Sequence, residues 1–233
     1  MSHETDRIVI SFNDILLRES DLAILQHKTE WINDNIISFA IEHYWRTQCK
    51  GDCSIKVITP SISQLIKSLV EVPTDIRKEM LDDVFSDSND LSTNSLIIIP
   101  VSDEGITAVR RGGSHWSLLV LNSLTKTITH FDSMDSANIV DARLMARILA
   151  QYFDQRQFDP EIEIGKCPKQ NNGYDCGLHV IANAMSVMSM FKGISEGHDI
   201  QNIVSGLKKE LLQTITLLND KEQILEFESR NFK

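Results

Sequence analysis

The stretch QNNGYDCG at Gln170–Gly177 opens directly into the apolar run LHVIANAM at Leu178–Met185. The Asn172-Gly173 pair is a turn signal, because glycine adopts positive φ at no steric cost. Asp175 can cap a helix, so the pattern places Cys176 in the first helical turn. Unpaired N–H groups and the positive end of the helix dipole favour a thiolate there and could bind an oxyanion. Two interpretations stay open: Cys176 is a reactive nucleophile or a small buried apolar residue.

Three apolar segments upstream are short enough to be strands. Leu96–Val101 and Trp116–Leu121 are largely continuous apolar runs, as in strands buried on both faces, whereas Thr127–Phe131 alternates. Residues 122–126 join the last two segments as a hairpin. Further short strands are expected at Ile8–Phe12 and Ile162–Ile164. Helical patterns run through Trp31–Trp45, from Pro60 to Leu69, Thr74 to Phe85, Ala137 to Gln155, and Ile200 to Phe227.

Helices around a central group of strands indicate an α+β fold, with residues 1–233 forming a single domain. We expect Thr29 to cap the helix that contains Trp31, and Thr59 to cap the next one, with a proline as its first helical residue. Asp135 is the expected cap of the helix near Ala137. The C-terminal helical region, 199–228, has weak points at Gly206 and Asn219-Asp220, and no role is assigned to it.

Composition narrows the class of protein. The chain has 233 residues, 42% of them hydrophobic, a net charge of −10 and a pI near 5.1. The sequence has no basic stripe of the kind that binds nucleic acid. Nucleic acid is therefore not expected as a partner. No apolar run reaches the roughly 18 residues of a membrane span, and the polar first residues lack the pattern of a signal peptide. We therefore expect a cytoplasmic or nuclear protein that does not associate with membranes.

The four cysteines are expected to be free thiols in such a compartment. Cys49 and Cys53, with His43 nearby, lack a convincing second pair of zinc ligands. Zinc is accordingly disfavoured, and no metal or cofactor is expected.

An acidic stretch from Glu71 to Asp90 contains seven carboxylates against Arg77 and Lys78. It is either a solvated helix face or a docking surface for a partner with a basic face.

A cysteine nucleophile needs a base, and the base needs an orienting partner. His115 comes directly before the Trp116–Leu121 strand, and Asp132 comes directly after the Thr127–Phe131 strand. If these strands pair antiparallel, the start of the first lies beside the end of the second. The topology alone therefore predicts that His115 and Asp132 are neighbours.

Other residues near these strands have plainer interpretations. His130 and His179 lie inside a strand and a helix, which favours a packed or a surface residue over a base at each position. Trp116 is either part of the core or a recognition residue beside His115. The glycine-rich segment Arg110–Ser114 is expected to be mobile, with Gly112-Gly113 as a hinge beside His115.

Taken together, these residues resemble the ubiquitin-like protein proteases, the Ulp and sentrin-specific cysteine proteases, with adenain as a distant cousin. The resemblance rests on His115-Trp116-Ser117, on Phe131-Asp132-Ser133, on Gln170–Gly177 and on Trp31-Ile32-Asn33-Asp34. The order His, Asp, Cys matches the family, as does a glutamine six residues before the cysteine. The short chain looks most like the deneddylase branch.

The resemblance implies a papain-like fold with a central mixed sheet flanked by helices, and it implies a role for each matching residue. Cys176 would be the nucleophile, His115 the general base and Asp132 the residue that orients it. Gln170 would donate to the oxyanion. Trp31 and Trp116 would enclose the Gly-Gly tail of a modifier, because flat aromatic walls exclude anything larger than glycine. Asp34 would be a further contact with the tail.

The implied activity is cleavage after the C-terminal Gly-Gly of a ubiquitin-like modifier, most similar to that of proteases acting on the neddylation modifier. The implied partners are that modifier and its conjugates such as cullins, bound by a monomer. Three alternatives stay open: a SUMO- or ubiquitin-specific protease, an acetyltransferase on the same fold, and a catalytically silent modifier-binding module.

Overall fold

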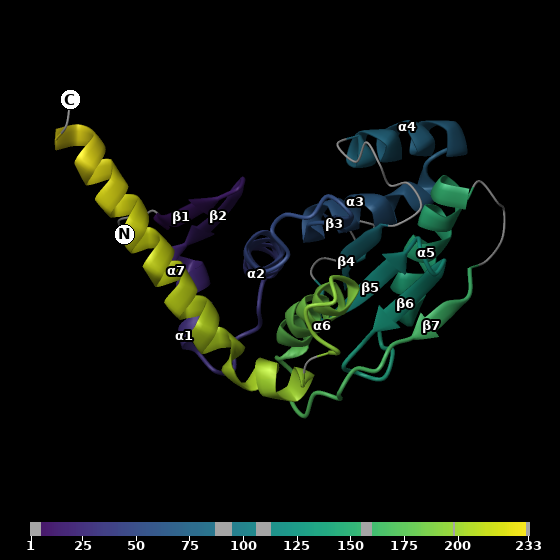
Figure 1. The fold of residues 1–233 in the computed structure, drawn as a ribbon. Helices are drawn as coiled ribbons and strands as arrows, with labels where there is room; N and C mark the ends of the chain where they lie inside the picture. The colour runs from purple at the N-terminus through teal and green to yellow at the C-terminus, as the bar shows by residue number, and fades with distance from the viewer. Residues whose placement is uncertain (1–5, 87–94, 106–112, 155–159, 198, 232–233) are drawn as a thin grey trace, which may run out of the picture.

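The apolar strands meet in a five-stranded mixed sheet with the order β3-β4-β5-β6-β7 (Figure 1). The computed structural model describes residues 6–86, 95–105, 113–154, 160–197 and 199–231. The two outer pairs, β3 with β4 and β6 with β7, are parallel, and the two inner pairs are antiparallel. The strands are β3 (Ile55–Val57), β4 (Leu96–Ser102), β5 (Trp116–Asn122), β6 (Thr127–Phe131) and β7 (Ile162–Ile164). The predicted α+β class with a mixed sheet is confirmed.

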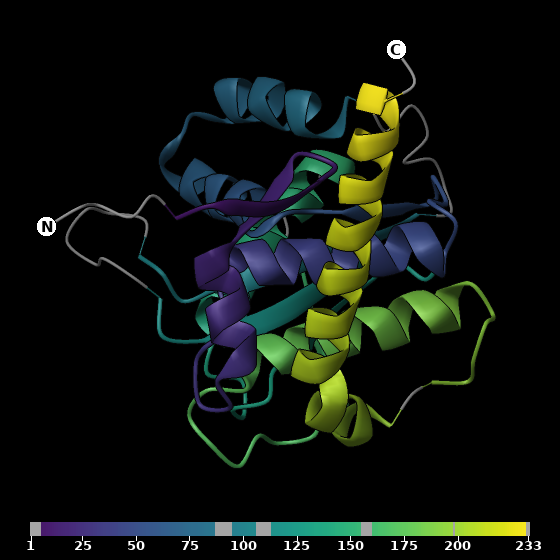
Figure 2. The same ribbon diagram turned by 90° about the vertical axis from the view of Figure 1, so that its left-hand side faces the viewer.

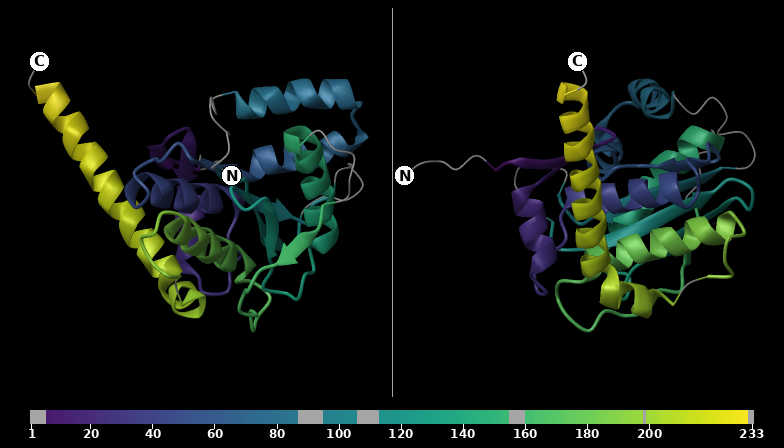
Figure 3. Two further views of the ribbon diagram at one scale, coloured as in Figure 1. Left: turned by 45° about the vertical axis from the view of Figure 1, so that its right-hand side comes forward. Right: turned by 60° about the vertical axis from the view of Figure 1, so that its left-hand side comes forward.

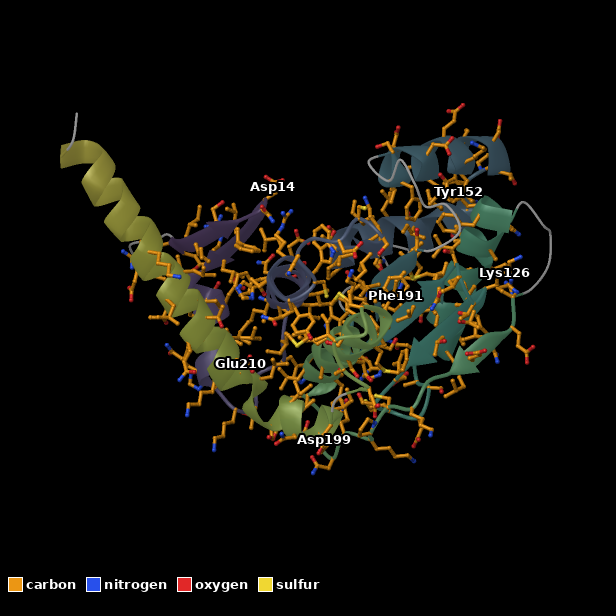
Figure 4. The ribbon with its side chains drawn as sticks, viewed as in Figure 1. Asp14, Lys126, Tyr152, Phe191, Asp199 and Glu210 are labelled. Carbon is orange, nitrogen blue, oxygen red and sulfur yellow. The ribbon has the colours of Figure 1, made fainter. Side chains whose placement is uncertain are left out.

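Both faces of the sheet are covered by helices, because its central strands are apolar on both faces (Figure 3). Alternate residues of β4 belong to two separate cores: Leu96 and Ile98 to one, Ile97 and Ile99 to the other. The first core includes α2 (Asp34–Thr47), α6 (Cys176–Phe191) and α7 (Ile200–Asn231). The second includes α3 (Pro60–Ser68), the 3₁₀ turn η1 (Leu69–Glu71), α4 (Thr74–Phe85) and α5 (Ile139–Asp154). Figure 4 shows side chains filling the space between the sheet and the helices on both sides.

A small two-stranded sheet stands apart from the main one. β1 (Ile8–Phe12) pairs antiparallel with β2 (Ile15–Arg18), and α1 (Glu19–Gln26) follows directly. The connecting residues Asn13 and Asp14 both have positive φ, of 45° and 63°. This conformation suits a two-residue hairpin turn, and Asn and Asp tolerate it best among residues with a side chain.

The C-terminal helix α7 is continuous from Ile200 to Asn231, so the expected helical region is present and neither weak point, Gly206 or Asn219-Asp220, interrupts it. A buried stripe formed by Val204, Leu207, Leu211 and Ile215 explains its persistence. Such packing outweighs the roughly 1 kcal/mol by which glycine disfavours a helix. The helix packs against α6, α1 and β1, and its C-terminal end projects beyond the rest of the chain (Figures 1 and 2).

Of the four predicted helix caps, Thr59 is confirmed, and Thr29, Asp135 and Asp175 differ in the structure. α2 begins at Asp34 rather than near Trp31, because Asn33 accepts the Ile36 N–H at 3.0 Å and replaces Thr29 as the cap. α5 begins at Ile139, so Asp135 lies too far upstream to occupy its capping position, and the Asp135 carboxylate binds Lys169 at 2.7 Å. Thr59 caps α3 as predicted. Asp175 lies beside Cys176 and is described with the active site.

Replacing Ile98 by alanine should lower the free energy of unfolding by about 2–5 kcal/mol, because the side chain is fully buried in β4, an interior strand of the sheet. Urea unfolding followed by circular dichroism measures the change. Leu124→Ala is the matched control, since Leu124 is 61% exposed in the β5–β6 turn and should change stability by no more than about 0.5 kcal/mol. Equal losses in both variants would contradict the placement of the core.

Candidate active site

The predicted contact between His115 and Asp132 is present. β5 and β6 pair antiparallel with Leu118 opposite Phe131, so the residues that flank the strands at this end are adjacent. His115 Nε2 lies 2.7 Å from Asp132 Oδ1, and both side chains are at least 95% buried. The other ring nitrogen, Nδ1, has no hydrogen-bond partner in the described part of the chain. It is therefore the nitrogen available to the thiol of Cys176.

Electrostatics favour a protonated His115. Burial lowers the pKa of the imidazole, but the hydrogen bond with Asp132 and the interactions with Cys176 outweigh that effect and raise the pKa to about 9. For Asp132, burial would raise the pKa, whereas hydrogen bonds from His115 and from the Asn138 and Met134 N–H groups hold it below its ordinary value. The pair is consequently an imidazolium beside a carboxylate at neutral pH. Such a cation stabilises a neighbouring thiolate.

Cys176 is the first residue of α6, as predicted, and is 2% exposed. Its N–H group lies in the first helical turn and has no intrahelical acceptor. The capping prediction for Asp175 is wrong in detail: Asp175 precedes the helix, but its side chain makes no capping bond. Its carboxylate instead accepts a hydrogen bond from Asn172 Nδ2 at 2.7 Å, which fixes the loop before the nucleophile.

Gln170 lies beside the residue that follows Asp132. Its Oε1 accepts from Ser133 Oγ at 2.6 Å, and its backbone N–H donates to the Ser133 carbonyl at 3.0 Å. Its Nε2 donates to the Asn172 carbonyl at 2.6 Å. These partners fix the orientation of the amide, since Nε2 is the only side-chain atom of Gln170 that can donate. One of its two N–H bonds remains available for an oxyanion.

Trp31 and Trp116 both adjoin residues of the site. Trp116 follows His115 at the start of β5 and is partly buried. Trp31 is 45% exposed, and the next residue, Ile32, packs against Gly177. A methyl group added at Gly177 would lie 2.8 Å from Ile32 Cβ, so the residue after the nucleophile has to be glycine for this approach. Asp34 is exposed at the first turn of α2, and its carboxylate accepts no hydrogen bond from the residues that the structure describes.

The backbone of His115 is held by residues that the sequence did not single out. Its N–H donates to Asp103 Oδ1 at 2.9 Å, and its carbonyl accepts from Asn138 Nδ2 at 3.2 Å. The Asn138 backbone N–H also donates to Asp132 Oδ2 at 2.9 Å, so one buried residue connects the histidine to the carboxylate.

A buried lysine supports this arrangement from α3. Lys67 Nζ donates to the carbonyls of Ser102 and Glu104, which flank Asp103, and pairs with Asp141 at 3.1 Å. Gly113 closes against the same segment, because a methyl group added there would lie 2.3 Å from Ser102 Oγ. Residues 106–112 lie outside the described residues, and Gly112 is one of them. The mobility predicted for the Gly112-Gly113 hinge therefore remains a prediction.

Other titratable groups near the site are poorly suited to nucleophilic or acid–base roles. Burial lowers the pKa of His130, which lies 4.0 Å from Asp132 through its Nε2, so this ring is neutral at pH 7. His179 is also buried, with a lowered pKa. Burial raises the pKa of Cys167 to about 11, against the effect of its bond from Asn183, which leaves it a thiol. Cys176 is the cysteine whose thiol interacts with an imidazolium.

The described residues contain no metal-binding cluster and no membrane-spanning helix. No group of three or more His, Cys, Asp or Glu side chains there is placed to hold a metal ion. None of the helices in the described ranges has the length and apolar character needed to cross a bilayer.

A cysteine at a helix N-terminus, a histidine at the start of a strand and an aspartate on the next strand define a papain-like cysteine peptidase site. Residues 30–213 match the sequence model of a protein family described as "Ulp1 protease family, C-terminal catalytic domain". The chain belongs to this family. Sentrin-specific protease 8 from Homo sapiens is 33% identical over 188 residues, which cover 80% of this chain and 84% of that protein. NEDD8-specific protease 1 from Arabidopsis thaliana is 29% identical, with 91% and 94% covered.

Solved structures support the same fold. The crystal structure of a de-sumoylating protease matches 98% of this chain and 96% of its own with a TM-score of 0.65 and 18% identity. The C-terminal Ulp1 protease domain in complex with the yeast ortholog of SUMO has a TM-score of 0.62 and 18% identity, with 92% and 89% covered.

The raised pKa of His115 predicts the alkaline limit of activity. Below pH 9 the imidazolium can stabilise a thiolate and donate a proton to a leaving amine, and above it the proton is lost. The value of kcat/KM should therefore decline above about pH 9, by about tenfold per pH unit. In Asp132→Asn the residual activity should decline from a lower pH, because the carboxylate that raises the pKa is gone. A pH–rate profile in which both proteins share one alkaline limit would refute this assignment.

Asn138→Ala should lower kcat by about tenfold to hundredfold with a smaller effect on KM, because it removes the bond to the His115 carbonyl and lets the imidazole shift. The backbone bond to Asp132 is kept. Steady-state kinetics measure the effect, and circular dichroism verifies that the variant is folded. Asn202→Ala, an exposed asparagine on α7, is the control for the same change of side chain. An unchanged kcat would show that Asn138 does not position the base.

Proposed function

We propose that this chain is a deneddylase: a cysteine protease that cleaves after the C-terminal Gly-Gly of NEDD8, both in precursors and in isopeptide conjugates such as neddylated cullins. The observation that carries the proposal is the buried His115–Asp132 pair, with Nδ1 left to Cys176, in a chain whose relatives include NEDD8-specific proteases. The family membership supports the chemistry, and the names of the relatives support the choice of modifier.

The chemistry follows from the positions of the groups. The Cys176 thiolate attacks the carbonyl of the terminal glycine, and the resulting oxyanion is met by the Cys176 N–H and the free N–H of Gln170 Nε2. His115 then donates its proton to the leaving amine, and a thioester remains on Cys176. Water, deprotonated by His115, hydrolyses the thioester and releases the modifier. Asp132 keeps the imidazole oriented throughout.

Access to the thiol favours a thin substrate. Cys176 is almost completely buried, so a peptide must reach it in an extended form. Two glycines in succession present no side chains and fit such a path. In this proposal Trp31 and Trp116 line the path, with Asp34 as a further contact. Solved relatives hold ubiquitin-like modifiers: the yeast ortholog of SUMO in one complex, and ubiquitin on a Xanthomonas campestris effector protein in another.

The acidic residues of α4 contribute to the rate at which the modifier associates with the protein, rather than to the choice between modifiers. Asp75, Glu79, Asp82 and Asp83 are exposed there, and Lys78 pairs with Asp82. α4 stands on the sheet face opposite α6, which carries Cys176 (Figure 1). A field from that side can raise association rates with a basic modifier but cannot shape the pocket.

A panel of modifiers tests the proposal. NEDD8, SUMO and ubiquitin, each ending in a C-terminal electrophile, are mixed with the protein, and the rate of covalent labelling is followed by mass spectrometry. NEDD8 should label Cys176 at least about tenfold faster than the others, which corresponds to about 1.4 kcal/mol of discrimination. Cys176→Ala should not be labelled but should still bind NEDD8.

Each of the other outcomes would indicate a different function for this chain. Faster labelling by SUMO or ubiquitin would overturn the choice of modifier while leaving the protease mechanism intact. Binding of NEDD8 without labelling of the wild-type thiol would indicate a silent binding module. Acetyl transfer from acetyl-CoA, with no labelling by any modifier, would indicate the acetyltransferase alternative.

A further inference from the structure

The loop between α1 and α2 has no apolar anchor in the part that precedes Trp31. All four side chains from His27 to Glu30 are exposed, so this part of the loop contributes nothing to the core. The loop nevertheless leads directly into Trp31, the residue proposed to line the tail path. Its backbone must therefore be held by something other than its own side chains if Trp31 is to keep one position.

Lys208 on α7 supplies that anchor. Its ammonium group donates to three carbonyls of the loop: His27 at 2.8 Å, Lys28 at 3.3 Å and Glu30 at 2.6 Å. An ammonium group has three N–H bonds, so these carbonyls can use its whole donor capacity. Hydrogen bonds from a charged donor are about twice as strong as neutral ones, which suits them to fixing a solvated loop. Figure 4 labels Glu210, two residues further along the same helix.

The same ammonium group interacts electrostatically with Asp175, the residue before α6. Partial burial lowers the pKa of Lys208, whereas the carboxylates of Asp175 and Glu30 raise it. Asp175 directly precedes Cys176. Lys208 therefore interacts electrostatically with the residue before the nucleophile, in addition to its hydrogen bonds with the loop before Trp31.

Trp31 is fixed on its other side as well. Ile32 is 1% exposed and packs against Gly177, the residue after the nucleophile. Asn33 donates to the buried Asp21 at 2.6 Å and caps α2. Trp31 thus stands between a point fixed by α7 and a point fixed on the active-site helix.

From this geometry we infer that Lys208 is a positioning residue for substrate binding: it holds Trp31 at the side of Cys176 where the modifier tail enters. The inference rests on the proposed role of Trp31 and gives the C-terminal helix a part in substrate recognition. Lys208 touches no reacting atom, so its effect should fall on the binding of the tail rather than on the chemistry of the thiol.

The experiment compares Lys208→Met, Lys208→Arg and Lys209→Met in the full chain, with a modifier–amide substrate ending in Gly-Gly. Lys208→Met keeps most of the side-chain volume and loses all three donors, so KM should rise about tenfold with kcat changed by less than about threefold. Lys208→Arg should recover most of the affinity. Lys209 is exposed and adjacent, and Lys209→Met makes the same change of charge, so it should stay within about twofold of wild type.

Two further readouts separate positioning from general destabilisation. Hydrogen–deuterium exchange of residues 27–33 should rise in Lys208→Met while exchange in β4 and β5 stays unchanged. Alkylation of Cys176 by iodoacetamide, which does not use the tail path, should keep its wild-type rate. Exchange that rises throughout the chain, or a KM that stays unchanged, would overturn the inference.

A double-mutant cycle with Trp31→Ala distinguishes this inference from the function on which it rests. If Lys208 acts through Trp31, then Lys208→Met should add little to the KM of Trp31→Ala. A normal KM in Trp31→Ala would refute the proposed tail-binding role itself. A raised KM in Trp31→Ala, with full additivity of Lys208→Met, would refute only the role of Lys208.

Discussion

The antiparallel pairing of β5 with β6 is the constraint on which the site depends. The pairing sets Leu118 opposite Phe131, and in doing so it places His115 and Asp132 at one end of the sheet, 2.7 Å apart. A slip of one residue would turn every side chain of β6 to the other face. Asn122 resists such a slip, because its Oδ1 accepts the N–H groups of Leu124 and Thr125 and fixes the turn. The chemistry is thus tied to the register of two strands.

Burial of a charged pair is costly unless its remaining polar atoms find partners. Asp132 meets this requirement with two backbone N–H groups in addition to His115. Both backbone polar groups of His115 are bound as well, by Asp103 and by Asn138. Lys67 then supports Asp103 through the carbonyls on either side of it. The support extends outward in this way from the pair to α3 and α5.

The sequence predicted the parts of the site that depend on local signals. Strand ends, a turn before an apolar helix and a short hairpin were enough to bring His115 to Asp132 and to start α6 at Cys176. Thr29 was wrong as a cap because several capping residues lie within one turn, and Asp21, distant in the sequence, decides among them by holding Asn33. Roles that depend on carbonyl acceptors were missed. Every residue has a carbonyl, so nothing in the sequence shows that Lys208 bonds three of them, or that Asn138 bonds His115. The helical region from Ile200 onward was predicted, and its weak point at Gly206 does not interrupt α7, since tertiary packing overrides local propensity.

The two separate cores on either side of the sheet have a consequence for how the enzyme can change. The nucleophile belongs to a helix in the layer with α2 and α7, whereas the base and its carboxylate belong to the sheet. The distance between thiol and imidazole therefore depends on how the helical layer packs against the sheet. The distance between imidazole and carboxylate depends on the sheet alone. Substitutions accumulating in the helical layer can shift the entry path for new substrates while the proton-transfer pair stays intact. A scaffold divided in this way allows recognition and acid–base chemistry to diverge at different rates.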